Sequence, residues 1–205
     1  MRGYILNLKK HRDEDLIVSI LCADRLFSLY RFYGARHSPL QLGYKIDFAC
    51  ENDPFFMPRL RSVSHLGFDW LFEISKIRYW QIFLHLLHRH LAGIETIDEF
   101  YFSLLDRAAL KLSVQNPKRV LIETACALWE REGRLHRDLK CLICERRIDD
   151  PFVALLRCLA PAHGECARKE GFRREAVIRL FETNETILFD DKEVDLLWRI
   201  VEEGL

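Results

Sequence analysis

The hydrophobic pattern of this chain changes its period once, near residue 69. Before that point, apolar and polar residues alternate over short segments, which is typical of β-strands. After it, apolar residues recur at steps of three and four, which is typical of amphipathic helices. The sequence therefore predicts an α+β fold with an N-terminal β domain at residues 1–68 and a helical domain at residues 69–205.

Five segments of the first part have strand character. They are Gly3–Lys9, Asp15–Leu21, Leu26–Tyr33, Tyr44–Cys50 and Arg59–His65. Several of these strands start roughly 8–12 residues apart, which is typical of a small barrel or sandwich. A five-stranded oligonucleotide/oligosaccharide-binding (OB) barrel fits that count, and an SH3-like barrel fits it as well.

Three amphipathic helices with short connections follow, and they predict an α-helical bundle. A last helix comes after a cysteine-rich window. The predicted boundaries are Gly93 after the first helix, Thr96 with Glu99 as a capping box before the second, Asn116-Pro117 and Gly133 around the third, and Asp190 with Glu193 before the last.

The cysteine-rich window contains two metal-binding pairs. Cys141 and Cys144 form a CxxC pair, and His163 and Cys166 form an HxxC pair. Eighteen residues lie between the two pairs. Each pair presents two ligands from one tight turn, so the four side chains suit a tetrahedral zinc ion. We expect a structural zinc ion, Zn(2+), in a zinc-ribbon-like module inserted into the helical domain at about residues 141–166.

Two alternatives stay open at this module. Cys158 could replace His163 as the fourth ligand, although its apolar neighbours favour a buried free cysteine. The thiols could also be core residues or a redox pair with no metal. A catalytic zinc is disfavoured, because the zinc deaminases carry their CxxC after the HxE, and here the order is reversed.

Composition and charge narrow the possible locations and partners. No apolar stretch approaches the roughly 20 residues of a membrane span, and the N-terminus lacks the plan of a signal peptide. We therefore expect a cytoplasmic protein. The net charge is zero, but residues 1–180 carry 29 Lys/Arg against 23 Asp/Glu, and the acidic excess lies in residues 181–205. A basic body can bind phosphate backbones even when the whole chain is neutral.

Cations and aromatic residues alternate around the end of the third predicted strand. Bases stack on aromatic rings, and arginine pairs with phosphate. Because strand parity places Arg31 on the same face as Tyr33, we predict an exposed nucleic-acid-binding set there, which the resemblance given below assigns to DNA. Its members are Arg31, Tyr33, Arg36 and His37, joined by Lys9 and Lys10 at the end of the first strand. The alternative is that the aromatic residues face the core and only the cations are exposed.

The order of these features resembles the RecO family of bacterial recombination mediators, in its short epsilonproteobacterial form. The matching segments are Gly3-Tyr4-Ile5-Leu6, Glu14-Asp15-Leu16-Ile17-Val18, Gly34-Ala35-Arg36-His37-Ser38, Asn116-Pro117-Lys118-Arg119 and the two knuckle pairs. His163 stands where many relatives have cysteine. The resemblance implies an N-terminal OB domain, a helical bundle and a zinc ribbon.

The resemblance also implies a function in DNA repair through the RecFOR pathway, in association with the nucleoid. It implies binding of single- and double-stranded DNA and annealing of complementary strands. It implies partnership with RecR and with the C-terminal tail of the single-stranded DNA-binding protein SSB, so that RecA loads onto covered strands. It implies no catalysis, no small-molecule substrate and no membrane contact.

Two other classes of function remain possible from the sequence. One is a zinc-ribbon adaptor that binds only proteins, and the other is a zinc-dependent hydrolase or deaminase. Otherwise the sequence contains no glycine-rich phosphate loop, GxSxG elbow or HExxH motif, so we expect no enzyme.

Overall fold

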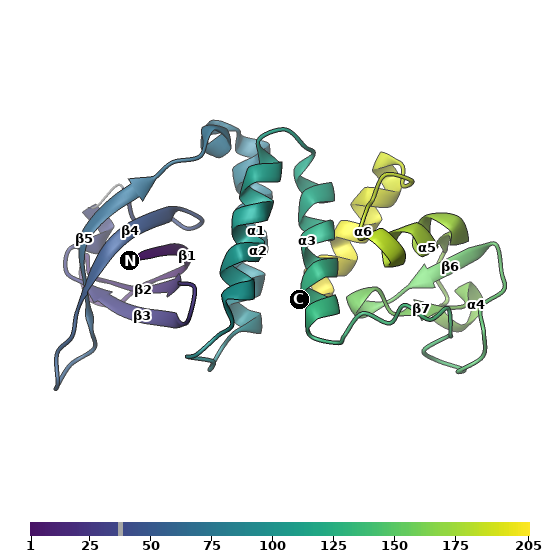
Figure 1. Cartoon of the computed structure of the whole chain (residues 1–205), viewed down its shortest axis with the longest axis horizontal. Helices are drawn as coiled ribbons and strands as arrows, with labels where there is room; N and C mark the ends of the chain where they lie inside the picture. Colours follow the sequence, from purple (N-terminus) through teal and green to yellow (C-terminus); the bar gives the residue numbers. More distant parts are fainter. Residues whose placement is uncertain (37–38) are drawn as a thin grey trace. The chain divides into compact units, whose positions relative to one another are not determined.

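A computed structural model of the chain describes residues 1–36 and 39–205, which form two compact units (Figure 1). The first unit contains residues 1–117 and the second contains residues 118–205. The predicted three-helix bundle is divided by this boundary. The predicted division into domains at 1–68 and 69–205 stays a proposal, because compactness alone does not show which segments fold independently.

A closed five-stranded barrel forms the start of the first unit, as predicted. Its strands are β1 (Arg2–Lys10), β2 (Leu16–Leu21), β3 (Leu26–Arg31), β4 (Lys45–Glu51) and β5 (Arg59–Leu66). They are paired in the order β1-β2-β3-β5-β4, and β4 closes the barrel on β1. All pairs are antiparallel except β3 with β5, which meet in parallel at Tyr30 and Arg59. This is an OB-like barrel.

The barrel encloses an apolar core, which the alternating strands predict. The fully buried side chains Ile5, Val18, Ile20, Leu29 and Leu60 belong to it. Burying such side chains stabilises a fold by roughly 1.5–3 kcal/mol each, so this core is the main source of the stability of the barrel.

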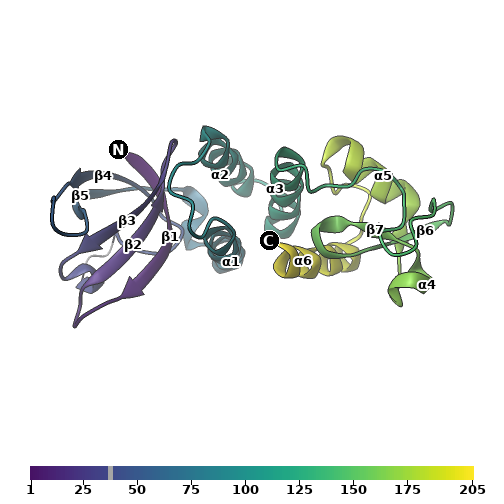
Figure 2. The same ribbon diagram turned by 90° about the horizontal axis from the view of Figure 1, so that it is seen from below.

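β1 is buried on both faces, which simple alternation does not predict. Ile5 belongs to the barrel core, whereas its neighbour Tyr4 packs on Trp80 and Phe102 outside the barrel, with ring centroids 5.8 and 5.6 Å away. The Tyr4 hydroxyl donates a hydrogen bond to Asp106 at 2.5 Å. Figure 2 shows the helices that carry these partners beside β1.

These helices are α1 (Ile74–His90) and α2 (Glu99–Leu112). The predicted cap of α2 at Thr96 is wrong, because Asp98 is the N-cap and its carboxylate accepts from the Phe100 N–H at 2.8 Å. Thr96 instead lies in an extended segment that bridges to Arg25. Because this segment pairs with the β2–β3 turn, the helix starts two residues later than predicted.

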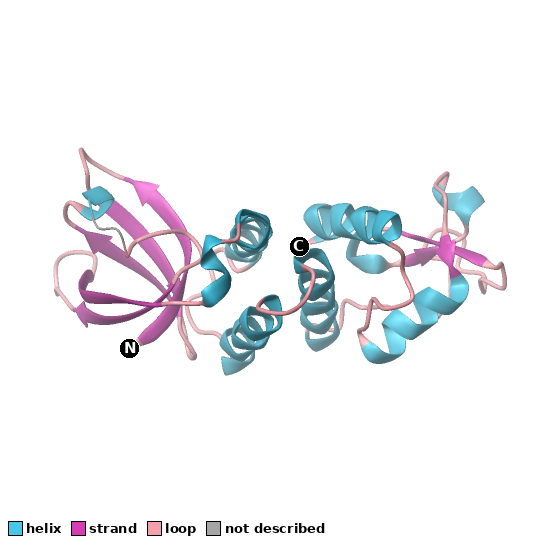
Figure 3. Ribbon diagram, turned by 90° about the horizontal axis from the view of Figure 1, so that it is seen from above, coloured by secondary structure: helices cyan, strands magenta, loops and turns pink. Residues whose placement is uncertain are grey.

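The second unit combines four helices with a small three-stranded sheet (Figure 3). Its helices are α3 (Pro117–Arg131), α4 (Gly164–Ala167), α5 (Arg174–Thr183) and α6 (Asp191–Gly204), and its strands are β6 (Phe152–Leu155), β7 (Pro161–Ala162) and β8 (Phe172–Arg173). The predicted start of α3 at proline is confirmed, and so is the capping box of Asp190 and Glu193 at α6.

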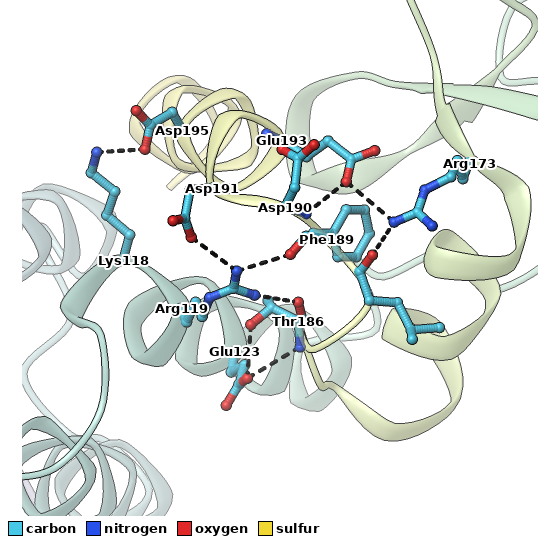
Figure 4. A network of polar contacts seen from close by, with 11 residues as sticks. Lys118, Arg119, Glu123, Arg173, Thr186, Phe189, Asp190, Asp191, Glu193 and Asp195 are labelled. Carbon is cyan, nitrogen blue, oxygen red and sulfur yellow. Dashed lines mark hydrogen bonds and ion pairs between the residues drawn. The ribbon is translucent and has the colours of Figure 1, made fainter.

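The segment Asn116-Pro117-Lys118-Arg119 lies at the start of α3, and its last residue, Arg119, contacts the loop before α6 (Figure 4). Its guanidinium donates to the carbonyls of Thr186 and Phe189 at 2.6 and 2.8 Å, and it pairs with Asp191 at 3.2 Å. These carbonyls lie in the loop between α5 and α6. One side chain on α3 therefore holds the loop that starts α6.

Among the residues that the structure describes, no helix is both long and apolar enough to cross a bilayer.

Candidate functional sites: a Cys/His cluster and a basic barrel edge

The structure brings the two predicted knuckle pairs together. Cys141 and Cys144 lie in the turn before β6, and His163 and Cys166 lie at the start of α4. Their candidate ligand atoms all lie within 4.8 Å of one another. Within residues 1–36 and 39–205, this is the one group of three or more metal-ligand side chains so arranged.

The spacing fits a tetrahedral zinc ion. His163 Nδ1 lies 3.4 Å from Cys144 Sγ and 3.8 Å from Cys166 Sγ. With Zn–S about 2.3 Å and Zn–N about 2.0 Å, neighbouring tetrahedral ligands lie roughly 3.5–3.8 Å apart. On the other side of the ring, His163 Nε2 lies 3.2 Å from the Arg147 carbonyl. A carbonyl only accepts, so Nε2 carries the proton and Nδ1 is available to the metal.

Backbone N–H groups favour thiolate at the first knuckle. Burial raises the pKa of the Cys141 thiol, but N–H groups of Cys144, His163 and Ile143 lower it by more, to about 6. At the second knuckle, desolvation followed by the neighbouring thiols of Cys144 and Cys141 raises the pKa of Cys166 to about 11. A divalent cation would relieve that repulsion, so the donor set fits a metal ion.

Cys158, the alternative ligand, lies outside this cluster. Its Sγ lies 3.4 Å from the Gly204 carbonyl and 3.0 Å from a guanidinium nitrogen of Arg134. Cys158 has a positive φ of 56° inside a short 3₁₀ turn, and that turn packs against α6. The backbone therefore directs this thiol away from the other cysteines.

The cluster offers four candidate protein ligands from two turns. Four ligands complete a tetrahedral shell, whereas catalytic zinc sites keep one position for water. The arrangement therefore suits a structural zinc ion that joins the two turns.

A basic edge lies at the end of β1 and in the turn that follows. Lys9, Lys10 and Arg12 are exposed. In the described part of the chain, none of the three has a carboxylate within ion-pair distance. The three cations are therefore not held in ion pairs and can act on an anionic partner.

The predicted residues after β3 lie in different surroundings. Tyr33 is 62% exposed, and the exposed Arg36 lies over its ring at 5.8 Å while pairing with Glu14. Arg31 is half-buried and donates to the Leu60 carbonyl at 2.8 Å. His37 lies outside the described residues.

The parity argument that placed Arg31 beside Tyr33 is wrong. β3 ends at Arg31, and Tyr33 has a left-handed φ of 50°. Asp15 holds that turn, because its carboxylate accepts from the Tyr33 N–H at 2.7 Å and from the Tyr30 hydroxyl at 2.5 Å. These two hydrogen bonds lower the pKa of Asp15.

Sequence reasoning missed a group of exposed apolar residues near this edge. Phe55 and Phe56 are 87% and 70% exposed, Phe32 is 43% exposed, and Met57 is also exposed. Three consecutive apolar residues between Pro54 and Pro58 in a predicted loop were the available signal. We call Phe32, Phe55, Phe56 and Met57 the aromatic patch.

The fold of the barrel agrees with a match to a known protein family. The first unit starts with a closed OB-like barrel, and the second unit carries the Cys/His cluster. Barrels of this class bind oligonucleotides or oligosaccharides in many proteins. Residues 1–71 match the protein-family model described as "RecO N terminal", and this match supports a RecO-type protein. The match covers the barrel and the segment that follows it, about a third of the chain. None of the curated proteins matches the chain.

Proposed function

We propose that this chain is a DNA repair and recombination mediator that binds single- and double-stranded DNA and anneals complementary strands. In the full proposal it acts with RecR, contacts the SSB tail and helps RecA to load on covered strands, in the cytoplasm. The observation that carries the proposal is the RecO-type match over a closed OB-like barrel. A mediator role in DNA repair and recombination follows at family level, and the individual steps and partners remain proposals.

The basic edge supports the DNA-binding part of the proposal. Lys9, Lys10 and Arg12 would neutralise phosphates and release condensed counterions, which gives an affinity that falls with salt. Arg36 is a weaker candidate, since Glu14 already pairs with it. Binding of this kind does not read sequence, and it applies to single strands and duplex alike.

Annealing follows from holding two strands on one protein. Cations reduce the repulsion between the phosphate chains, and proximity raises the effective concentration of one strand near the other. No bond is broken, and no nucleotide hydrolysis is needed. The zinc ion would hold the two turns of the Cys/His cluster and take no part in the chemistry.

The test is a double charge reversal at the basic edge. We expect Lys9→Glu/Lys10→Glu to weaken binding to single strands and duplex by about tenfold or more near 100 mM salt. We also expect the slope of log affinity against log salt concentration to be smaller in magnitude by about two, since two phosphate contacts are lost. Fluorescence anisotropy over a salt series measures both, and annealing of SSB-coated strands measures the consequence.

The control reverses two exposed cations on α6, Lys192→Glu/Arg199→Glu, which changes the net charge equally. This variant should bind almost as the wild type does. Equal losses in both variants would show a general charge effect. An unchanged affinity and slope in the first variant would contradict the proposed DNA-binding surface.

A further inference from the structure

The aromatic patch exposes three consecutive apolar side chains of the β4–β5 loop together with Phe32. Phe55 and Phe56 are 87% and 70% exposed at the tip of that loop. Exposed apolar side chains that gather in one place often mark a binding site, whereas single ones need no explanation. The barrel core does not use these side chains, so packing does not account for their presence.

The loop that carries the patch is fastened at its base. The Asp53 carboxylate accepts from the Phe55 N–H at 3.0 Å and pairs with Arg59 at 3.3 Å. The Pro58 carbonyl accepts from the Tyr30 N–H at 2.8 Å. These contacts restrain the loop that carries the rings. Less conformational entropy is then lost when a ligand binds to the rings.

A surface pocket of about 280 Å³ joins the patch to β3 and β5. Tyr30, Phe32, Phe56, Met57 and Arg59 line it. The Tyr30 and Phe32 rings meet edge to face at 4.9 Å, and the Arg59 guanidinium lies over the Phe32 ring at 5.4 Å. Apart from Met57, the lining residues therefore present planar groups with π faces, and the volume lies just below the usual range of about 300–1,000 Å³ for ligand pockets.

The patch continues into the basic edge. The His11 ring contacts the Tyr30 ring edge to face at 5.7 Å, and Tyr30 in turn contacts Phe32. His11 follows Lys9 and Lys10 directly in the chain. A ligand lying along this surface would therefore meet unpaired cations first and exposed rings next, which matches a chain of phosphates that carries planar bases.

We infer that the aromatic patch stacks unpaired bases of single-stranded DNA, an inference that rests on the proposed DNA binding of the barrel. Stacking on aromatic rings and arginine planes is tolerant of sequence, because every base has a π face. A duplex hides those faces within its own stack. The patch therefore favours single strands, whereas the basic edge binds both forms.

This division also supplies a reason for the annealed product to leave. While a strand is unpaired, it is held by phosphate contacts and by stacked bases. Once two strands pair, the base faces are withdrawn from the patch and only the phosphate contacts remain. The duplex is then held more weakly than the strands that formed it.

The experiment compares three fluorescent probes of equal length on the full chain: oligo-dT, an abasic oligonucleotide with the same number of phosphates, and a duplex. We expect the wild type to bind oligo-dT about tenfold more tightly than the abasic probe. We expect Phe55→Ala/Phe56→Ala to bind oligo-dT as weakly as the abasic probe and to bind the duplex unchanged. Both side chains are largely exposed, so the fold should persist, which thermal unfolding checks.

Phe72→Ala is the matched control, since Phe72 is 92% exposed beyond the other end of β5. It should bind all three probes as the wild type does. Equal wild-type affinity for oligo-dT and abasic probe would overturn the inference, and so would an equal loss on all three probes in the Phe55/Phe56 variant. In either result, weaker binding by Lys9→Glu/Lys10→Glu would still support the proposed function. Failure of the wild type to bind any probe would overturn both.

Discussion

The barrel and the Cys/His module obtain their structure in different ways. The barrel has strands of six to nine residues that close around buried apolar side chains. The module around residues 141–166 has one strand of four residues and one of two. Three of its four ligand side chains are only partly buried. A long hydrogen-bonded ladder around an apolar core is stable without help, whereas short strands around clustered thiols need a cross-link.

The difference predicts how each region responds to loss of metal. We expect about one zinc ion per chain, since four ligands make one tetrahedral site. We expect a chelator to abolish hydrogen-exchange protection in residues 141–166 and to leave the barrel strands protected. Metal binding contributes on the order of 10 kcal/mol in zinc-finger peptides, so this is the largest effect. Elemental analysis and hydrogen exchange measure it.

Ligand variants provide the control for this prediction. His163→Ala should weaken zinc binding by at least about 100-fold, more than the loss typical of an outer-shell partner. Cys158→Ser should retain the metal, because its thiol lies outside the cluster. The reverse result would exclude our ligand set. Loss of hydrogen-exchange protection in the barrel after chelation would show that the stability of the barrel depends on the Cys/His module.

A cavity in the barrel core should destabilise the barrel and leave the Cys/His module unchanged, which is the opposite of the effect expected from metal removal. Leu29 is fully buried in this core, so Leu29→Ala should destabilise the barrel by about 2–5 kcal/mol. Zinc content should not change. Hydrogen exchange of the barrel strands gives the free energy, and Ile74→Ala, at an exposed site in the same unit, should have almost no effect. A similar loss at both positions would show that burial does not determine the effect.

The smallest effect concerns the turn after β3. Hydrogen bonds from the Tyr30 hydroxyl and the Tyr33 N–H lower the pKa of Asp15 in the folded state. Its stabilising contribution is therefore present above the unfolded pKa of about 3.9 and is lost as the pH falls through the folded pKa. We expect Asp15→Asn to be slightly less stable than the wild type at neutral pH and equally stable in strong acid. Denaturation across a pH series measures this, and parallel curves would contradict it.

Sequence patterns were reliable where local chemistry decides the outcome. All five strands appear near the predicted places, and the capping box of Asp190 and Glu193 starts α6, since alternation and a cap motif are both patterns of neighbouring residues. The cap at Thr96 was wrong because its segment pairs with the β2–β3 turn, far away in the sequence. Strand parity failed beyond Arg31 because Asp15 holds the next residues in a turn.

The two Cys/His pairs and the five strands can be read from the sequence, because spacing and alternation are local properties of a chain. The placement of His163 in the cluster, and of Cys158 outside it, depends on the folded chain, because a backbone turn and the neighbouring Gly204 direct the Cys158 thiol elsewhere. The folded chain also decides which aromatic rings are exposed. Exposure depends on what packs against a residue from distant parts of the chain, and no local pattern contains that information.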